Sequence, residues 1–346
     1  MDSSEYIKNR IQTLTQDSED IRRQADTTND FDTWSGLKLI LHSAAVNMYT
    51  TVLENQEFFE DLYYIDALAG SGVSTHDQSG SCFLGSPVIA AKVAEEPFRK
   101  MFLIEKNKNK ADALRQRLRY VFENHSDTKE PHEWEVIAGD ANKEICNVKK
   151  EINRISRPKN RGYNYYCFID NQELNVKWST IRELAPRPYG DLLVNLPTAS
   201  GIGRNATQDP VPEKLNDFYC QDLNNTNVPE NNIRPRMKQL YRECLAELDR
   251  PVQKVTNVDA NVGSYEYDLV YATRETDGGS SYIEVIDYVK ELIENVHAGD
   301  VNNILEVLEN NQSQINQYIP ERDIDDKLPE SSDKDDSQSS LTDFGS

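Results

Sequence analysis

The feature that most constrains the fold is a regular alternation between short apolar runs and helical patterns in the middle of the chain. Five runs of strand length are rich in β-branched and aromatic residues and almost continuously apolar: residues 62–68, 100–106, 133–140, 163–170 and 189–196. Such runs are typical of parallel strands that are buried on both faces. Helical patterns separate them, at residues 86–96, 109–125, 141–155 and 176–185. This order predicts a doubly wound α/β sheet.

Two more strand candidates follow near the end of the pattern, at residues 252–260 and 264–276. Only a few residues separate them, and a parallel crossover needs about a dozen. They should therefore pair as an antiparallel hairpin. A mostly parallel, seven-stranded sheet with a terminal antiparallel hairpin is the topology of the class I S-adenosylmethionine-dependent methyltransferases, a Rossmann-like fold, and this is the fold that we predict.

Three regions are expected along the chain. Residues 1–60 should form N-terminal helices, of which residues 34–52 carry an apolar i, i+3, i+4, i+7 series that predicts an amphipathic helix packed on the core. Residues 61–318 should form the α/β domain, and within it the segment around residues 75–87 an extended loop able to close over a ligand, with Ser86 as the cap of the next helix. Residues 319–346 are acidic, rich in serine and almost without apolar side chains, which predicts a disordered tail.

The charge balance narrows the classes of function. Lysine and arginine number 38 against 59 aspartates and glutamates, so the net charge is 38 − 59 = −21. Non-specific binding to nucleic acids needs cations, so this balance disfavours a general nucleic-acid coat protein but leaves a local basic groove open. A strongly acidic surface is also typical of proteins that stay soluble in high salt, so a halophilic source and an ordinary acidic protein remain alternatives.

Cysteines and apolar segments indicate the compartment. The five cysteines are far apart and form no C-x-x-C pair, which predicts a reducing environment with neither disulfides nor a zinc site. The histidines show no ligand spacing, so no metal site is expected. The first residues do not resemble a secretion signal, and no apolar run approaches the roughly 18 residues of a membrane span. We therefore expect a cytoplasmic protein with no membrane association.

A glycine turn follows the first strand of the predicted sheet. The strand ends at Asp66, and Ala69, Gly70 and Gly72 come directly after it. Ligands of open α/β sheets bind at the carboxyl ends of the strands, and glycine has no Cβ to keep a ligand away from the backbone. These four residues are therefore candidate cofactor contacts, although a glycine turn without a ligand is the alternative.

Acidic residues end the next two strands as well. Glu105 is placed to accept hydrogen bonds from both hydroxyls of a ribose, and Asp140 to meet the amine of an adenine beside Ala141, although Asp140 could equally cap a helix. Together with Asp66 they predict a pocket for an adenosine with an amino acid attached, that is, S-adenosylmethionine. A dinucleotide is disfavoured because the third glycine of its fingerprint is missing and Glu105 lies far beyond the about 20-residue interval.

These motifs resemble the three-Cys-motif partner (TcmP) family, a prokaryotic group with a class I methyltransferase-like fold. The resemblance runs from about Trp34 to about Arg274. Its pieces are WSGLKLIL at 34–41, YIDALAGSG at 64–72, GSP at 85–87, FLIEKN at 102–107, GDAN at 139–142, FID at 168–170 and DLLVNLP at 191–197. The resemblance implies that Asp66, Gly70, Gly72, Glu105 and Asp140 contact the cofactor. It also implies a protein partner with three cysteines and a radical-type iron–sulfur centre.

One motif departs from the family. There the fourth strand usually ends in Asp-Pro and then an aromatic residue or glycine, which together bind a target amine, whereas this chain has Asp170-Asn171-Gln172. Asp170 and Asn171 are therefore the candidate catalytic residues of a methyltransferase acting on an amine, with a nucleic-acid base as a possible acceptor. The alternative is a non-catalytic or cofactor-sensing partner of the three-cysteine protein. A nicotinamide-dependent oxidoreductase is the least favoured hypothesis.

Overall fold

A seven-stranded sheet forms the centre of the protein. The computed structural model describes residues 3–31, 33–54, 59–76, 82–126, 128–156, 162–185, 190–198, 202, 205–226, 232–259, 266–275 and 281–294. In spatial order the strands are β6 (Trp134–Ala138), β5 (Lys100–Glu105), β2 (Phe59–Asp66), β7 (Gly162–Ile169), β8 (Asp191–Leu196), β10 (Glu266–Thr273) and β9 (Val252–Asp259). The pairs from β6 to β8 are parallel, and β10 runs antiparallel to both of its neighbours. The predicted α/β fold with a mostly parallel sheet and an antiparallel hairpin is confirmed.

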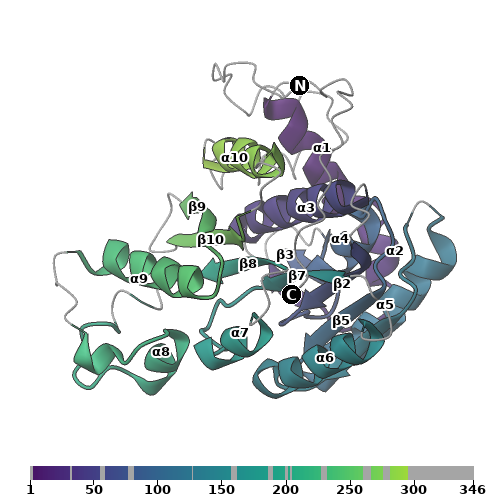
Figure 1. Ribbon diagram of the computed structural model, residues 1–346. Coiled ribbons are helices and arrows are strands. Elements are labelled where there is room, and N and C mark those ends of the chain that lie inside the picture. The colour runs from purple at the N-terminus through teal and green to yellow at the C-terminus, as the bar shows by residue number, and fades with distance from the viewer. Residues whose placement is uncertain are drawn as a thin grey trace, which may run out of the picture.

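Helices cover both faces of this sheet (Figure 1). One face packs against α3 (Thr33–Glu54), α4 (Ser86–Val93), α5 (Lys108–Asn124) and α10 (Ser281–Glu294). The other packs against α6 (Ala141–Ser156), α7 (Trp178–Leu184), α8 (Glu213–Phe218) and α9 (Ile233–Glu247). A short 3₁₀ helix, Leu223–Asn225, follows α8. Successive residues of a strand point to opposite faces, so both faces of each central strand must be apolar, as the uninterrupted runs in the sequence indicate.

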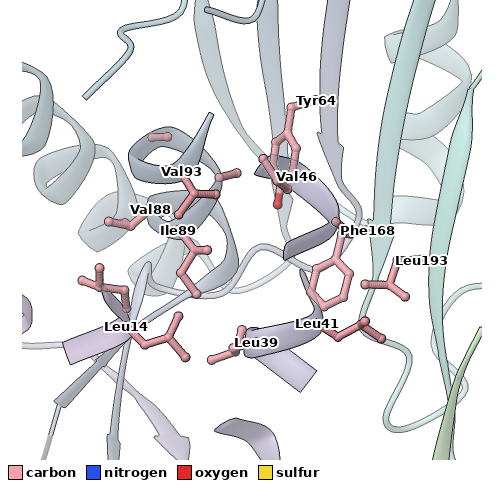
Figure 2. Packing of buried hydrophobic residues seen from close by; sticks show 14 of the residues in the cluster. Leu14, Leu39, Leu41, Val46, Tyr64, Val88, Ile89, Val93, Phe168 and Leu193 are labelled. Atoms are coloured by element: carbon pink, nitrogen blue, oxygen red, sulfur yellow. The ribbon is translucent and has the colours of Figure 1, made fainter. Parts of the chain in front are cut away.

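The long helix α3 is buried on nearly every side, which corrects the expectation of an amphipathic helix. It contacts β2, β7 and β9 on one side and α1 (Ser3–Thr15), α4 and α10 on the others. In Figure 2, Leu41 of α3 lies beside Phe168 of β7 and Leu193 of β8. Its polar residues Lys38 and His42 are buried as well. The periodic stripe located the sheet-facing side correctly, but the helices that cover the opposite side come from distant parts of the sequence.

A second, three-stranded sheet replaces the expected extended loop. It consists of β1 (Asn29–Phe31), β3 (Val73–His76) and β4 (Cys82–Leu84). β1 pairs parallel to β3, and β3 pairs antiparallel to β4. The N-terminal segment, which includes α2 (Ser18–Arg22), thus contributes a strand to the region beyond residue 60. Because three residues make a weak local signal, β1 could not be found in the sequence alone.

The prediction that the cysteines form no disulfide is wrong. Cys220 and Cys244 are bonded and are separated by 24 positions along the chain. Cys244 lies in α9 and Cys220 just after α8, so the bond joins two elements of the same face. Sequence spacing could not reveal the pair because the two cysteines form no recognisable motif and are far apart along the chain.

Two further predictions concern the C-terminal tail and membrane-spanning helices. The predicted disordered tail, residues 319–346, lies outside the described residues. The described helices include none that is both long enough and apolar enough to cross a membrane.

Candidate cofactor and acceptor site

Four candidate site positions lie along one edge of the sheet, at the carboxyl ends of adjacent strands. Asp140 follows β6, Glu105 ends β5, Gly70 lies in the loop after β2, and Asp170 follows β7. The strand order β6-β5-β2-β7 places them in that sequence along the edge. This is the edge at which open α/β sheets bind ligands.

The two glycines of the turn have different neighbours. Both adopt a left-handed backbone, with φ of +64° at Gly70 and +83° at Gly72, which a residue with a Cβ adopts only under strain. A Cβ on Gly72 would lie 2.8 Å from the Leu114 side chain of α5, so close helix packing accounts for this glycine. A Cβ on Gly70 would lie 2.4 Å from Asn29 Nδ2 of β1. Gly70 therefore faces β1 and the sheet edge, whereas Gly72 faces the core.

Glu105 holds the glycine turn through its carboxylate. Oε2 accepts a hydrogen bond from the Gly70 N–H at 2.9 Å, and Oε1 accepts one from the Asn107 N–H at 2.6 Å. A carboxylate offers about four lone-pair sites, so these two bonds leave acceptor capacity for the hydroxyls of a ribose.

Asp66, a predicted cofactor contact, is fully buried and holds the start of α4. It accepts hydrogen bonds from Ser86 Oγ at 2.6 Å, Tyr64 Oη at 3.0 Å and the Leu68 N–H at 3.2 Å. Ser86 was predicted to cap α4, but it is the first residue of that helix, and Gly85 occupies the cap position. Burial raises the pKa of Asp66 to about 7, against the lowering effect of its hydrogen bonds. Ala69 is likewise buried.

His42 of α3 continues this buried network. Its Nδ1 lies 3.1 Å from Tyr166 Oη, and its Nε2 lies 3.2 Å from the Ser86 carbonyl and 3.3 Å from Tyr64 Oη. Burial lowers the pKa of His42 to about 3, so the ring is neutral at pH 7. Asp66 and His42 are thus linked through Tyr64 inside the protein.

Asp140 caps α6, which was the alternative role considered for it. Its Oδ1 accepts a hydrogen bond from the Asn142 N–H at 3.0 Å, and Ala141 is the buried first residue of the helix. The Lys106 ammonium, 3.0 Å from Oδ2, holds the pKa of Asp140 below its usual value. The carboxylate is partly exposed, so its cap role and an outward contact are compatible.

Asp170 lies in a cluster that the sequence analysis did not anticipate. Lys38 Nζ of α3 lies 2.5 Å from Asp170 Oδ2, and Asn195 Nδ2 of β8 donates to Oδ1 at 2.8 Å. Lys38, Asp170 and Asn195 are called the Asp170 cluster below. The sequence features that could have indicated this cluster are Lys38 in a mostly apolar helix and Asn195 in a mostly apolar strand.

Asn171, the other residue predicted to be catalytic, makes its contacts outside this cluster. Its side chain is buried, and its amide donates to the Val176 carbonyl and accepts from the Val176 N–H, both at 3.0 Å. Both ends of the amide therefore clamp the loop between β7 and α7, and Asp170 alone of the two faces the sheet edge.

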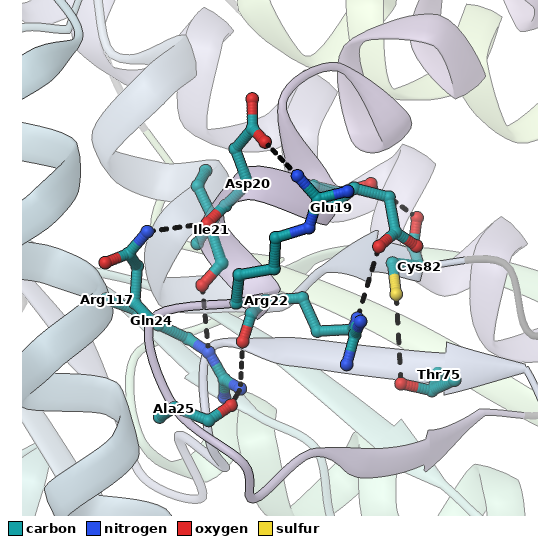
Figure 3. A network of polar contacts seen from close by, with 11 residues as sticks. Glu19, Asp20, Ile21, Arg22, Gln24, Ala25, Thr75, Cys82 and Arg117 are labelled. Atoms are coloured by element: carbon teal, nitrogen blue, oxygen red, sulfur yellow. Dashed lines mark hydrogen bonds and ion pairs between the residues drawn. The ribbon is translucent and has the colours of Figure 1, made fainter.

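Arg117 of α5 fixes the N-terminal segment against the glycine turn. Figure 3 shows it among residues of that segment, including Ile21 and Ala25. Its guanidinium is fully buried and donates to five carbonyl oxygens, at distances of 2.7 to 3.3 Å, those of Ile21, Arg22, Ala25, Thr27 and Ser71. This set is called the Arg117 hub. No carboxylate of the described residues pairs with Arg117, and burial lowers its pKa to about 10. By joining residues 21–27 to Ser71, the hub places Asn29 against Gly70.

Two buried amide oxygens near this edge have no hydrogen-bond donor, which bears on whether a ligand binds there. Among the described residues, Asn29 Oδ1 and Asn195 Oδ1 are buried and accept no hydrogen bond. An unmatched buried acceptor is unfavourable by about 1–3 kcal/mol, so each of these oxygens is suited to an N–H or O–H donor from a ligand. One lies at the glycine turn and the other beside Asp170, and the residues present therefore fit a polar ligand along this edge.

Other candidate features lie elsewhere. A surface hollow of about 240 Å³ lies at α7 and α8 and is lined by Trp178, Arg182, Asp217 and Cys220 among others. None of the sequence-predicted site residues lines it. Across the described ranges, no group of three or more His, Cys, Asp or Glu side chains is placed to hold a metal ion.

Comparison with known proteins gives only distant likenesses. No family model matches the chain. No curated protein matches it either. Among solved structures, LPL1258 from Legionella pneumophila aligns at 10% identity and a TM-score of 0.44, over 73% of this chain and 91% of that one.

Two further solved structures are methyltransferases. Magnesium protoporphyrin IX methyltransferase from Synechocystis with bound SAH aligns at 11% identity and a TM-score of 0.34, over 75% of this chain and 96% of that one. Human methyltransferase-like protein 13 in complex with SAH aligns at 11% identity and a TM-score of 0.36, over 75% and 93%. Because all three TM-scores are below 0.5, we assign no function from these similarities. The assignment of the fold is based on the strand order described above.

Proposed function

We propose that the protein is an S-adenosylmethionine-dependent methyltransferase of class I type that acts on an amine. The observation that carries this proposal is the order of groups along the sheet edge: Asp140, then Glu105, then Gly70, then Asp170. Candidate contacts for an adenine, a ribose and a methyl acceptor thus follow one another in the order of the cofactor's own parts. The unpartnered oxygen of Asn29 at the glycine turn further supports a ligand there.

Each residue would have a limited task in the reaction. Bound S-adenosylmethionine supplies a methyl group that is electrophilic because it is attached to a sulfonium sulfur. Glu105 and Asp140 would hold the nucleoside, and Asp170 would orient the acceptor nitrogen so that its lone pair points at the methyl carbon. Asp170 would also accept the proton that the acceptor nitrogen loses when it is methylated. That carboxylate is 22% exposed and so connects to solvent.

The test is calorimetric titration with S-adenosylmethionine, at moderate and at molar salt because the net charge of −21 is compatible with a halophilic source. Glu105→Ala removes the predicted ribose contact, and Glu123→Ala, an exposed acid of α5, is the matched control. Binding that is lost in Glu105→Ala and kept in Glu123→Ala supports the proposal. Absence of binding at both salt concentrations contradicts it. Asp66→Ala is unsuitable because Asp66 holds the start of α4.

The second candidate is a non-catalytic or cofactor-sensing partner of a three-cysteine, radical-type iron–sulfur protein. The internal pairing of Asp170 with Lys38 favours it, because the candidate catalytic carboxylate already has a cation. This function predicts that Asp170→Ala retains cofactor binding and partner-dependent activity, whereas a methyltransferase loses transfer to its acceptor.

A further inference from the structure

The Asp170 cluster combines a buried cation, a partly exposed anion and a buried amide at the end of β7. Lys38 is 3% exposed and Asn195 is 2% exposed, whereas the side chain of Asp170 is 22% exposed. The carboxylate is thus the part of the cluster that a molecule from solvent reaches first. Lys38 comes from α3 and Asn195 from β8, so two elements far apart in the sequence build one polar site.

The orientation of the Asn195 amide follows from its partner. An ionised carboxylate only accepts hydrogen bonds, so the atom that faces Asp170 Oδ1 at 2.8 Å must be the NH₂ group. The carbonyl oxygen is then the other end of the amide, and among the described residues it has no partner. A buried acceptor with no donor favours a ligand that brings an N–H group.

The charge of the cluster restricts which N–H group this is. Lys38 already neutralises Asp170 at 2.5 Å, so the pair offers no net negative charge to a second cation. An alkylammonium placed on Asp170 would also lie close to the Lys38 ammonium, and like charges at such separations repel strongly outside bulk water. A neutral nitrogen has no such opposition and can donate to Asn195.

The other titratable groups around the cluster do not supply a compensating charge at neutral pH. Burial lowers the pKa of His42 and keeps the ring uncharged, while Asp170 raises this pKa and Lys38 lowers it. Tyr267 of β10 contacts the Lys38 backbone, and its pKa is raised first by burial and then by Asp170, so it stays protonated. Asp66 also interacts electrostatically with Asp170, and it is held by Ser86 and Tyr64.

Resting on the proposed methyltransferase function, we propose that the Asp170 cluster selects an uncharged, conjugated amine as methyl acceptor and rejects alkylammonium groups. Asn195 Oδ1 accepts a hydrogen bond from the acceptor nitrogen, and Lys38 both neutralises Asp170 and repels cationic amines. The acceptor class is therefore the exocyclic amine of an aromatic or heteroaromatic ring. A lysine side chain or another aliphatic amine, protonated at neutral pH, belongs to the rejected class.

Two isomers provide a matched pair of probes. 4-Methylaniline and benzylamine contain the same atoms, but the first is an uncharged aromatic amine at pH 7.5 and the second is an alkylammonium. Ligand-observed NMR titrations of the full chain, with and without saturating S-adenosylhomocysteine, give a dissociation constant for each. We expect 4-methylaniline to bind at least about tenfold more tightly, which corresponds to about 1.4 kcal/mol.

Variants assign the preference to individual residues. Asn195→Leu should lose most of the affinity for 4-methylaniline and leave benzylamine unchanged. Lys38→Met should reverse the preference because it exposes the charge of Asp170, and Lys38→Gln, which keeps a donor toward Asp170, serves if the methionine variant does not fold. Lys92→Met is the control, since Lys92 is also a buried lysine, 5% exposed and 2.8 Å from Asp17, but lies outside the cluster.

The outcomes separate this inference from the proposed function. Tighter binding of benzylamine to the wild type, binding of neither isomer, or a preference that survives both Lys38 and Asn195 substitutions overturns the inference. S-Adenosylhomocysteine titrated alone tests the proposed function: if it binds while the isomers show no preference, only the acceptor assignment fails. If it does not bind, the methyltransferase proposal fails, and the isomer titrations without nucleoside still decide whether the cluster is an amine site.

Discussion

The Arg117 hub and the Asp170 cluster each bury a cation that joins distant parts of the chain, yet they differ in how their hydrogen bonds are matched. An arginine has five N–H donors, and Arg117 meets five carbonyl oxygens. In the Asp170 cluster, the Asn195 amide uses its NH₂ group on Asp170 and leaves its oxygen without a donor. The first region is complete by itself, and the second is complete only when something else binds.

This difference separates two roles that sequence motifs do not distinguish. A matched buried network stabilises one arrangement of the chain, because losing any partner leaves a polar group unpaired. An unmatched acceptor is unfavourable in the free protein and becomes favourable only with a ligand. By this criterion the hub is architecture for the glycine turn, whereas the Asp170 cluster is the binding site that we propose.

The largest effect should come from emptying the hub. Arg117→Met removes the donors of five buried carbonyls, and we expect the free energy of unfolding to fall by about 4 kcal/mol, as measured by urea denaturation. Arg119→Met, an exposed arginine two residues along α5, should change it by less than about 0.5 kcal/mol. Equal losses in the two variants would show that the hub is not a stabilising centre.

A second comparison uses two buried titratable groups, Asp66 and His42, that are linked through Tyr64. The pKa of Asp66 is raised from 3.8 to about 7, so its contribution to stability is full below pH 4 and is lost as the pH rises toward 7. The pKa of His42 is lowered from 6.5 to about 3, so its contribution is present above pH 6.5 and is lost on acidification. Between pH 4 and 6.5 the two effects oppose each other in the wild type.

Single substitutions should reveal each effect. In Asp66→Asn only the pH-dependent contribution of His42 remains. As the pH falls from 6.5 to 4, the free energy of unfolding of this variant should therefore decrease by about 3 kcal/mol more than that of the wild type. In His42→Gln only the contribution of Asp66 remains, so the free energy of unfolding should increase relative to that of the wild type as the pH falls over the same range. Urea denaturation at several pH values measures both, and parallel pH profiles for all three proteins would contradict this account.

The contact between β1 and the glycine turn sharpens the comparison at a smaller scale. Gly70→Ala forces a side chain into a left-handed position and against Asn29, and should lower the free energy of unfolding by about 2 kcal/mol. Adding Asn29→Ala removes the overlap and should restore about half of the loss. A double variant no more stable than Gly70→Ala would mean that backbone strain, not Asn29, limits this position.

The smallest effect is expected at the unmatched amide. Asn195→Leu removes a buried oxygen that has no donor as well as one hydrogen bond to Asp170, so the two changes largely cancel. Thermal or urea unfolding without ligand should differ from the wild type by less than about 1 kcal/mol. A loss comparable to that of Arg117→Met would show that Asn195 is matched in the free protein and would remove the distinction between the two regions.

The sheet could be predicted from the sequence because strands buried on both faces need continuous apolar runs, and each run from residue 62 to residue 196 became a strand. The edge positions of Glu105, Asp140 and Asp170 followed from the same runs. Their contacts did not, since Lys38, Asn29 and Arg117 reach the edge from elements whose packing depends on distant partners. Arg117 in particular is preceded by Arg115 and followed by Arg119, and nothing in that pattern marks the buried one.

The burial of α3 on nearly every side has a consequence for how the protein is made. This helix leaves the ribosome within the first 54 residues, but β7, β9 and α10, which cover it, end at residues 169, 259 and 294. Until those three elements are synthesised, this segment of 22 residues can pack only against the earlier ones, α1, β2 and α4, and the rest of its native surface stays uncovered. Transiently exposed apolar surface makes incomplete chains prone to aggregate, so the order of synthesis leaves one side of α3 open to such contacts until α10 has emerged.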